Sequence, residues 1–176
     1  SRNIMDQGNL TSKQLADYFL SQNPDFEKKD IIEFASVYIE EANFEGINSD
    51  VAFAQMCLET GYLRFGNLVT PEMNNFCGLG AMDAEHPGEV FETPRMGIRA
   101  HIQHLQAYGT TEDVKLNGQL IDPRYSWVHK TKFIQETLED DRFNTGERTL
   151  LLVCEEGEEE YDFSAFNGQN VYLKVI

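Results

Sequence analysis

The segment VAFAQMCLETG, residues 51–61, constrains the fold more than any other part of the chain. Its first eight residues are all apolar or amides, so the pattern predicts a central helix that is buried nearly all round. Asn48 or Ser49 is a suitable N-cap before it, and Gly61 is a suitable stop after it. One carboxylate, Glu59, stands in the last turn of this helix.

Two effects act on a carboxylate in that position. Apolar surroundings disfavour the ionised form of Glu59, and the negative end of the helix dipole does the same. Both effects raise the expected pKa, and a carboxylic acid that keeps its proton near neutral pH is suited to general acid catalysis. The alternative is an ordinary surface glutamate that emerges into solvent where the helix ends.

The rest of the first 142 residues is also mostly helical in pattern. Apolar residues recur at helical spacing, between suitable end residues, over 11–23, 25–46 and 94–109, and one more helix is expected over 127–140. Residues 62–93 lack strong periodicity and are rich in glycine and proline, which predicts a long irregular lobe. Loops of this length in a compact domain are usually functional.

The end of the chain has a different composition. TLLLVC (149–154) and NVYLKVI (170–176) are typical of strands, and the acidic run EEGEEEYD (155–162) is expected to be a solvated surface segment. We therefore expect residues 1–142 to form a mainly helical α+β domain. Residues 143–176 are expected to form an acidic, strand-like extension packed on the same domain.

Charge and cysteine content exclude several classes of protein. The chain has 176 residues, enough for one domain with a core, and a formal net charge of −16. This charge argues against binding to nucleic acid or docking on an anionic membrane, and no apolar stretch is long enough for membrane insertion. Three cysteines do not make a disulfide framework, so buried free thiols are expected; one bridge and one free thiol is the alternative.

Four motifs occur in an order that is fairly specific: AQMCLETGYLRFGN, NNFCGLGA, FETPRMGIRAHIQHLQAYG and DPRY. Over about residues 30–128, they resemble the glucosaminidase-type peptidoglycan hydrolases of glycoside hydrolase family 73. The resemblance implies a lysozyme-like fold, in which a helical lobe and a smaller irregular or β lobe flank a sugar-binding groove. It also implies endo-β-N-acetylglucosaminidase activity, which cleaves the β-1,4 bond after N-acetylglucosamine, without a metal or organic cofactor.

The resemblance assigns one catalytic role directly. Glu59-Thr60-Gly61 resembles the family's Glu-x-Gly element, whose glutamate is the catalytic acid. A second group must stabilise the oxocarbenium-like centre. We favour Glu92, which Phe91 and the following helix would hold at the edge of the groove; its alternative is an ordinary acid in the first turn of a helix, where the helix dipole favours a negative charge. The irregular lobe also offers Glu72, Asp83, Glu85 and Glu89. Retention, inversion and attack by the acetamido group of the substrate all stay open.

Sugar recognition uses amides, close backbone approach and flat apolar faces. The predicted substrate-binding residues are Tyr62, Asn74, Asn75, Phe76, Gly78 and Tyr125, with Phe65 and Gly80 as further possibilities. The aromatic residues have core packing as their alternative. The alternative for Asn75 is that it holds its own loop together through hydrogen bonds to the backbone. Tyr125 lies in a segment that resembles the family's Asp-Pro-x-Tyr, where a tyrosine lines the groove. The alternative for Tyr125 is that it packs within a turn.

Other chemistries are less well supported. His101 and His104 lie nearly on one helix face, but without an HExxH pattern or a third ligand at recognisable spacing no metal site is expected. A nucleophilic site that pairs Cys77 with one of these histidines is disfavoured, because Cys77 does not stand at a helix N-terminus. A catalytically idle glycan-binding or assembly module on the same fold is the alternative to an enzyme, and muramidase the alternative specificity.

The implied partner is the glycan strand of the bacterial cell wall. The implied location is therefore extracellular or in the cell envelope, with any leader removed from, or absent from, a chain that begins at Ser1. The sequence does not indicate an oligomeric state.

Overall fold

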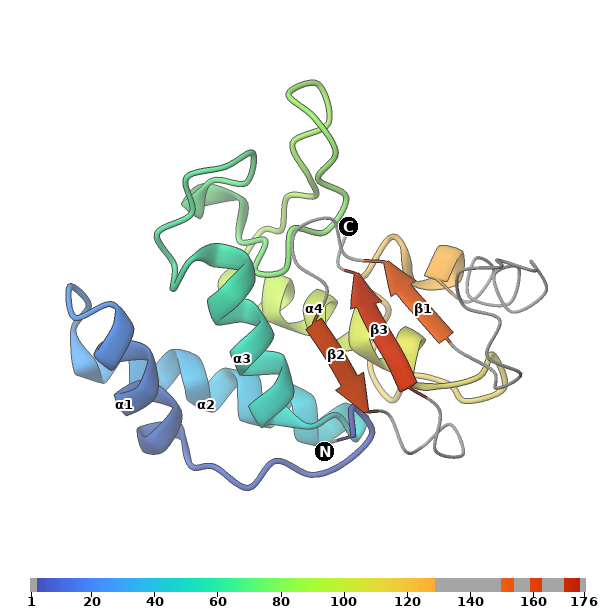
Figure 1. Ribbon diagram of the computed structural model, residues 1–176, viewed down its shortest axis with the longest axis horizontal. Helices are drawn as coiled ribbons and strands as arrows, with labels where there is room; N and C mark the ends of the chain where they lie inside the picture. The colour runs from blue at the N-terminus through green and yellow to red at the C-terminus, as the bar shows by residue number, and fades with distance from the viewer. Residues whose placement is uncertain (1–2, 129–149, 154–158, 163–169, 175–176) are drawn as a thin grey trace.

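The computed structural model describes residues 3–128 and the backbone of three strands at 150–153, 159–162 and 170–174. The protein is mainly helical, which confirms the predicted fold class (Figure 1). In chain order, the helices are α1 (Ser12–Gln22), α2 (Lys28–Glu45), α3 (Ser49–Thr60), the 3-10 helix η1 (Pro71–Met73) and α4 (Pro94–Gly109).

Local sequence explains where these helices begin and end. Thr11 and Gln14 form a reciprocal capping box at the start of α1. The Asn48 side chain accepts two backbone N–H groups from the first turn of α3. Gly46 and Gly61 adopt the left-handed conformation that ends α2 and α3. These boundaries agree closely with those expected from the sequence, except that α2 begins three residues later than expected.

Helix α2 is the central packing element, because it contacts α1, α3 and α4. The main core combines apolar side chains from all four α-helices with Phe76 from the irregular lobe. A second cluster, formed by Cys77, Leu79, Phe91 and Ala100, joins that lobe to α4. The irregular lobe is therefore anchored to the helical body by two apolar contacts rather than attached through its ends alone.

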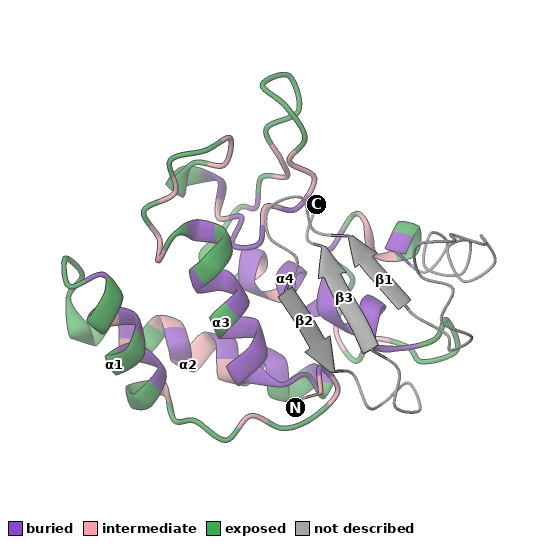
Figure 2. Ribbon diagram, viewed as in Figure 1, coloured by how far each residue is buried: buried purple, intermediate pink, exposed green. Residues whose placement is uncertain are grey.

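Helix α3 is buried along most of its length but not all round (Figure 2). Ala54, Leu58 and Glu59 are exposed, and they lie on one side at helical spacing. The predicted burial nearly all round therefore holds except for this stripe. The stripe runs to the end of the helix that carries the lone carboxylate.

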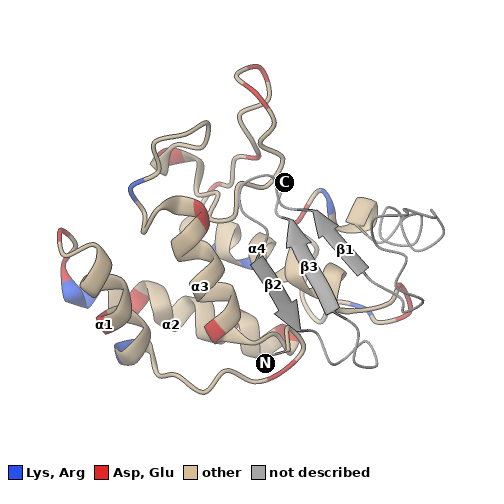
Figure 3. Ribbon diagram, in the orientation of Figure 1, with Lys and Arg blue, Asp and Glu red and all other residues tan. Residues whose placement is uncertain are grey.

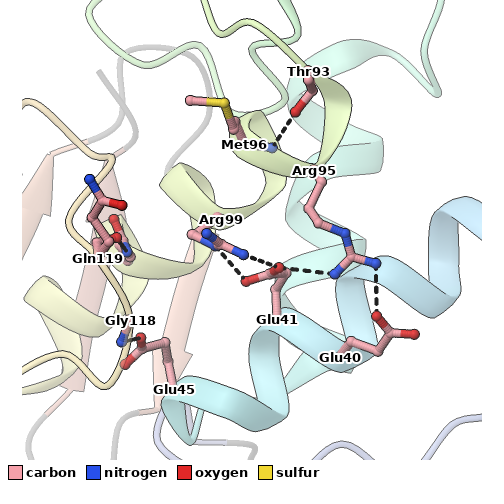
Figure 4. A network of polar contacts seen from close by, with 10 residues as sticks. Glu40, Glu41, Glu45, Thr93, Arg95, Met96, Arg99, Gly118 and Gln119 are labelled. Carbon is pink, nitrogen blue, oxygen red and sulfur yellow. Dashed lines mark hydrogen bonds and ion pairs between the residues drawn. The ribbon is translucent and has the colours of Figure 1, made fainter.

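An ion-pair network joins α2 to α4 (Figure 4). The nearly buried carboxylate of Glu41 accepts hydrogen bonds from Arg99 Nε and Nη2 at 3.0 and 2.9 Å and from Arg95 Nη1 at 3.0 Å. Burial opposes ionisation of Glu41, but the two guanidinium groups outweigh it and hold its pKa below the usual value. One turn further along α2, Glu45 accepts the backbone N–H groups of Asn117 and Gly118. These bonds fix α4 and the segment after it against α2.

Residues 61–93 form the irregular lobe predicted from the sequence (Figure 1). Two loops of this lobe project on the side where α3 ends, one on each side of the 74–80 segment. The lobe contains η1 and one isolated bridge between Asp83 and His86. Its projecting loops carry acidic side chains, and no Lys or Arg occurs between Arg64 and Arg95 (Figure 3).

The three strands form a sheet in the order β1-β3-β2. Strand β1 (Leu150–Val153) pairs parallel with β3 (Asn170–Lys174), and β2 (Glu159–Asp162) pairs antiparallel with β3. The two predicted strands are confirmed, and β2 is a third strand that lies within the acidic run 155–162. Of the helix predicted over 127–140, only residues 127–128 lie within the described part of the chain, and both are helical.

None of the helices in the described part of the chain has the length and apolar character needed to cross a bilayer.

Candidate active site

Glu59 lies in the last turn of α3, and its side chain is exposed. The expectation that apolar surroundings remove this carboxyl group from water is therefore wrong, and the side chain emerges into solvent where the helix ends. The helix end still places the group at the negative end of the α3 dipole. Glu59 Oε2 lies 3.7 Å from the point that a Cβ atom on Gly78 would occupy. The structure thus brings together two of the predicted site residues, Glu59 and Gly78.

The turn that follows Glu59 has an unusual backbone. Tyr62, Leu63 and Phe65 have φ angles of 56°, 60° and 57°, next to Gly61 at 57°. Residues other than glycine in the left-handed region cost about 1–3 kcal/mol each and persist only where surrounding contacts enforce them. Thr60 supplies one such contact, because its hydroxyl donates to Met56 O and accepts the N–H of Leu63.

Asn75 holds the irregular lobe together. Its side chain is buried, donates to the carbonyl oxygens of Leu79 and Glu89 at 2.9 and 3.0 Å, and accepts the N–H of Leu79 at 2.9 Å. Both ends of the amide are therefore used inside the protein. This is the alternative considered for Asn75 in the sequence, and the predicted direct contact with sugar is not available to this side chain in the structure.

Asn74 joins the same segment to the start of α4. It is half-buried, has a φ of 50°, and donates from Nδ2 to Phe91 O at 3.0 Å. Its own carbonyl oxygen lies directly against Gly97 of α4, so closely that a Cβ atom on Gly97 would overlap it. Glu92, the predicted second carboxylate, is exposed beside this junction, two residues before α4.

Gly78 and Gly80 both have positive φ angles, of 66° and 75°, which glycine adopts at little cost. A Cβ atom on Gly80 would lie 3.3 Å from Glu89 Oε1. The short segment 78–80 therefore has the carboxyl group of Glu59 next to one glycine and that of Glu89 next to the other. Glu89 is one of five candidates for the second carboxylate, and nothing in the sequence singles it out.

The predicted aromatic sugar contacts are mostly engaged within the protein. Phe76 is 5% exposed and packs edge-on against Phe34, so its ring face is not open to a sugar. Tyr62 is half-buried and packs against Phe19, and its hydroxyl lies 2.8 Å from that of Tyr18. That hydrogen bond, together with burial, raises the pKa of Tyr62 to about 12.

Tyr125 belongs to the turn that follows Asp122. It is half-buried, and its hydroxyl donates to Gln106 Oε1 of α4 at 2.6 Å. Asp122 closes the turn by accepting the N–H of Arg124. The structure therefore attaches Tyr125 to the C-terminal half of α4 and leaves part of its ring accessible.

The two histidines of α4 have separate partners. His101 is buried between Tyr38 and Gln55, with its Nδ1 2.8 Å from the tyrosine hydroxyl and its Nε2 2.7 Å from Gln55 Oε1. Because an amide oxygen only accepts, Nε2 carries the proton and Tyr38 donates to Nδ1. His104 instead pairs with the buried carboxylate of Asp122 at 2.9 Å. Within the described residues, no three potential ligands gather as a metal site would require.

Cys77 is 2% exposed and has a free thiol. Burial raises the pKa of Cys77 well above its ordinary value, and the nearby carboxylates of Asp122 and Glu59 raise it further. The thiolate that nucleophilic catalysis needs is therefore disfavoured. Cys57 is also buried and free, as expected, while Cys154 lies outside the described residues.

The buried, neutral His101 predicts a pH-dependent stability. Burial, and to a lesser degree His104, lowers the pKa of His101 to about 3. Below pH 6.5, His101 is protonated in the unfolded chain but stays neutral in the folded chain. The free energy of unfolding therefore falls as the pH falls towards 3. The loss should be about 1.4 kcal/mol per pH unit, or about 2 kcal/mol by pH 5.

Urea unfolding of the wild type and of His101→Gln at pH 7 and pH 5 measures this effect. The variant should lose less stability than the wild type between the two pH values, although it starts from a lower stability. Equal slopes for the wild type and His101→Gln would contradict a neutral buried His101.

Three structurally important residues were not singled out by sequence analysis. Gln55 is the one amide within an otherwise apolar run, which is a signal for a buried hydrogen-bond partner. Gly97 is a glycine inside a helical pattern, which signals a close approach of another segment. Asn23 is 2% exposed and donates to Tyr62 O, and its position before Pro24 gave no indication of this contact.

Comparison with known proteins addresses the predicted resemblance. The model of the glucosaminidase family, described as mannosyl-glycoprotein endo-beta-N-acetylglucosaminidase, matches residues 35–145. An uncharacterized protein of Borreliella burgdorferi is 39% identical over 127 residues. That alignment covers 72% of this chain and 61% of the relative, so the chain spans less than two thirds of the relative's length. No solved structure matches the chain.

The family match confirms the resemblance seen in the sequence. It extends from α2 through α4, and it includes Glu59, the whole irregular lobe and the turn of Tyr125. The chain belongs to the glucosaminidase family of glycoside hydrolases.

Proposed function

We propose that this protein hydrolyses the β-1,4 bonds of peptidoglycan glycan strands as an endo-β-N-acetylglucosaminidase, with Glu59 as the general acid. The observation that carries the proposal is the position of Glu59 within the family match. It is an exposed carboxyl group at the end of α3, next to the glycine segment 78–80 and at the base of the projecting loops. A glycan strand bound against the segment 78–80 would have its scissile bond within reach of this group.

The proposed chemistry assigns a proton transfer to Glu59. The protonated carboxyl group donates to the glycosidic oxygen as the bond to the anomeric carbon breaks. The α3 dipole disfavours the ionised acid, and a bound glycan would exclude water from the exposed side chain. The desolvation that raises the pKa of a carboxyl group would then come with the substrate. Gly78 leaves room for the carboxyl group and for the sugar at this point.

Reducing-end release from purified peptidoglycan tests the proposal. The wild type and Glu59→Gln are incubated with the polymer, bound protein is measured by co-sedimentation, and the new reducing ends are identified by reduction and mass spectrometry. The proposal predicts ends that carry N-acetylglucosamine, and release by the wild type only. A mannosyl-glycoprotein, the substrate in the family's description, serves as a second substrate in the same assay.

The other outcomes of this assay contradict parts of the proposal. Binding by both proteins without release by either would favour a catalytically idle glycan-binding module. New ends that carry N-acetylmuramic acid would replace glucosaminidase by muramidase specificity. Equal release by both proteins would remove Glu59 from the mechanism.

For the second carboxylate we propose Glu92, with Glu89 as the rival that its contact at Gly80 supports. Glu92→Gln should lower kcat at least about tenfold, because the oxocarbenium-like centre would lose a negative charge or a base. Glu89→Gln is the matched comparison, three residues away on the same lobe. A loss of rate in Glu89→Gln alone would transfer the role to Glu89, and unchanged rates in both would favour attack by the substrate's acetamido group.

The proposed substrate also implies a location. Peptidoglycan lies outside the cytoplasmic membrane, so we propose that the protein acts in the cell envelope or outside the cell.

A further inference from the structure

The strained turn after Glu59 is held by a part of the chain that precedes the family match. The turn consists of residues 61–65, three of which are non-glycine residues with positive φ. The family match begins at residue 35, within α2. Helix α1 and Asn23 lie before that point, yet their contacts converge on this turn.

Asn23 makes the most buried of these contacts. It is 2% exposed, and its Nδ2 donates to the carbonyl oxygen of Tyr62 at 2.8 Å. Its Oδ1 lies 3.3 Å from the backbone nitrogen of Asp25 and accepts that N–H, which fixes the orientation of the amide. The carbonyl group that Asn23 holds belongs to a peptide within the left-handed turn.

Two further contacts surround the first. Arg64 Nη2 donates to Gln22 O, the last residue of α1, at 3.0 Å. The hydroxyl groups of Tyr18 and Tyr62 lie 2.8 Å apart, and the ring of Tyr62 also packs edge-on against Phe19. At the end of α3 itself, the hydroxyl of Thr60 accepts the N–H of Leu63 at 2.9 Å. The turn is therefore fixed between α3 and the C-terminal half of α1.

A turn held on both sides determines where the last residues of α3 point. Left-handed backbone at non-glycine positions persists only where contacts enforce it, and such sites cluster where a side chain must be kept in one direction. Without the α1 contacts, residues 62–65 would relax towards ordinary φ values and the last turn of α3 would fray. Glu59 lies in that last turn.

We propose that the end of α1 is a positioning element of the active site, with Asn23 as its main positioning residue. Asn23 acts on Glu59 through the turn 61–65 and touches neither substrate nor the reacting atoms. The proposal rests on the proposed function of Glu59 as general acid. It also predicts that residues before the family match are needed for full activity and not only for solubility.

Asn23→Ala tests this role, with Asn48→Ala as the matched control. Both asparagines are 2% exposed, and Asn48 caps the opposite end of α3. Both variants should lose a similar amount of stability in urea unfolding. Asn23→Ala should lower kcat for reducing-end release at least tenfold with KM within twofold of wild type, whereas Asn48→Ala should keep kcat within twofold. Equal kcat values in the two variants would overturn the proposal.

A milder variant keeps the test decisive if Asn23→Ala does not fold. Tyr18→Phe removes only the hydroxyl bond to Tyr62 from an exposed residue, and it should lower kcat about two- to fivefold with KM unchanged. A Tyr18→Phe enzyme with wild-type kcat, combined with an unfolded Asn23→Ala, would leave Asn23 with a structural role only and would count against positioning.

Hydrogen exchange separates this proposal from the proposed function. The amides of residues 62–65 should exchange at least tenfold faster in Asn23→Ala than in Asn48→Ala, whether or not the protein cleaves peptidoglycan. If the wild type is inactive and exchange is faster in Asn23→Ala, the proposed function is contradicted, but the positioning of the turn by Asn23 is supported. If the wild type is active and exchange is unchanged in Asn23→Ala, only the positioning role of Asn23 is contradicted.

Discussion

Glu59→Gln should release reducing ends from peptidoglycan about 10²–10⁴-fold more slowly than the wild type, the range that general acid catalysis contributes. Glutamine keeps the size and the hydrogen-bonding capacity of the side chain, but it has no acidic proton to give to the leaving oxygen. KM should change little, because the substituted group still occupies the same place beside Gly78. Initial rates over a range of peptidoglycan concentrations measure both quantities.

The matched control is Glu33→Gln, an exposed glutamate of α2 that has no proposed role. It removes the same charge from an acidic protein and should keep the wild-type rate. Equal loss of rate in both variants would mean that the effect comes from net charge and not from the acid at the end of α3.

Gly97→Ala should cost more stability than an alanine at any of the other glycines in the described part of the chain. Helix propensity alone predicts a gain of about 1 kcal/mol, because Gly97 lies inside α4. The added Cβ would overlap the carbonyl oxygen of Asn74 and lie 2.9 Å from its carbonyl carbon, and a backbone segment held by other bonds does not yield easily. We therefore expect a net loss of about 3 kcal/mol or more, or failure to fold.

The sign of the change distinguishes the two effects. Urea unfolding of wild type and Gly97→Ala gives the difference in free energy directly. A more stable variant would show that the backbone at Asn74 moves aside. The contact between Asn74 and α4 would then not restrain the irregular lobe. A destabilised variant that still folds should also lose activity, since the same contact positions the segment leading to Gly78.

The helical body could be predicted well from the sequence because its signals are local. Periodic apolar residues, the Thr11 cap and the stops at Gly46 and Gly61 each act within one or two turns. The position of the irregular lobe in the sequence could be predicted, but its conformation could not, because its structure depends on contacts between distant residues. The bond from Asn75 to the carbonyl of Glu89 spans 14 residues and has no local signature.

The candidate site was predictable in part for the same reason. Glu59 could be singled out from the sequence because a lone carboxylate in an apolar helix is a local anomaly. Its exposure to solvent could not be predicted, because this depends on which face of α3 the irregular lobe leaves uncovered. Residue type alone did not distinguish a sugar platform from a core residue, as Phe76 shows by packing against Phe34. The hydrogen bond from Asn23 to the carbonyl oxygen of Tyr62 joins residues 39 apart, so it could be found only from the folded structure.

The Asn75 amide fixes the base of the loop between residues 79 and 89 and does not constrain the length of the loop beyond that base. Because one side chain joins the backbone at positions 79 and 89, the stretch between them is a closed loop whose ends do not depend on its own length. Insertions or deletions near the exposed Asp83–His86 bridge would change how far the loop reaches while leaving Gly78 and Glu59 in place. A change in the length of this loop would thus alter how far the lobe projects without moving the carboxyl group of Glu59.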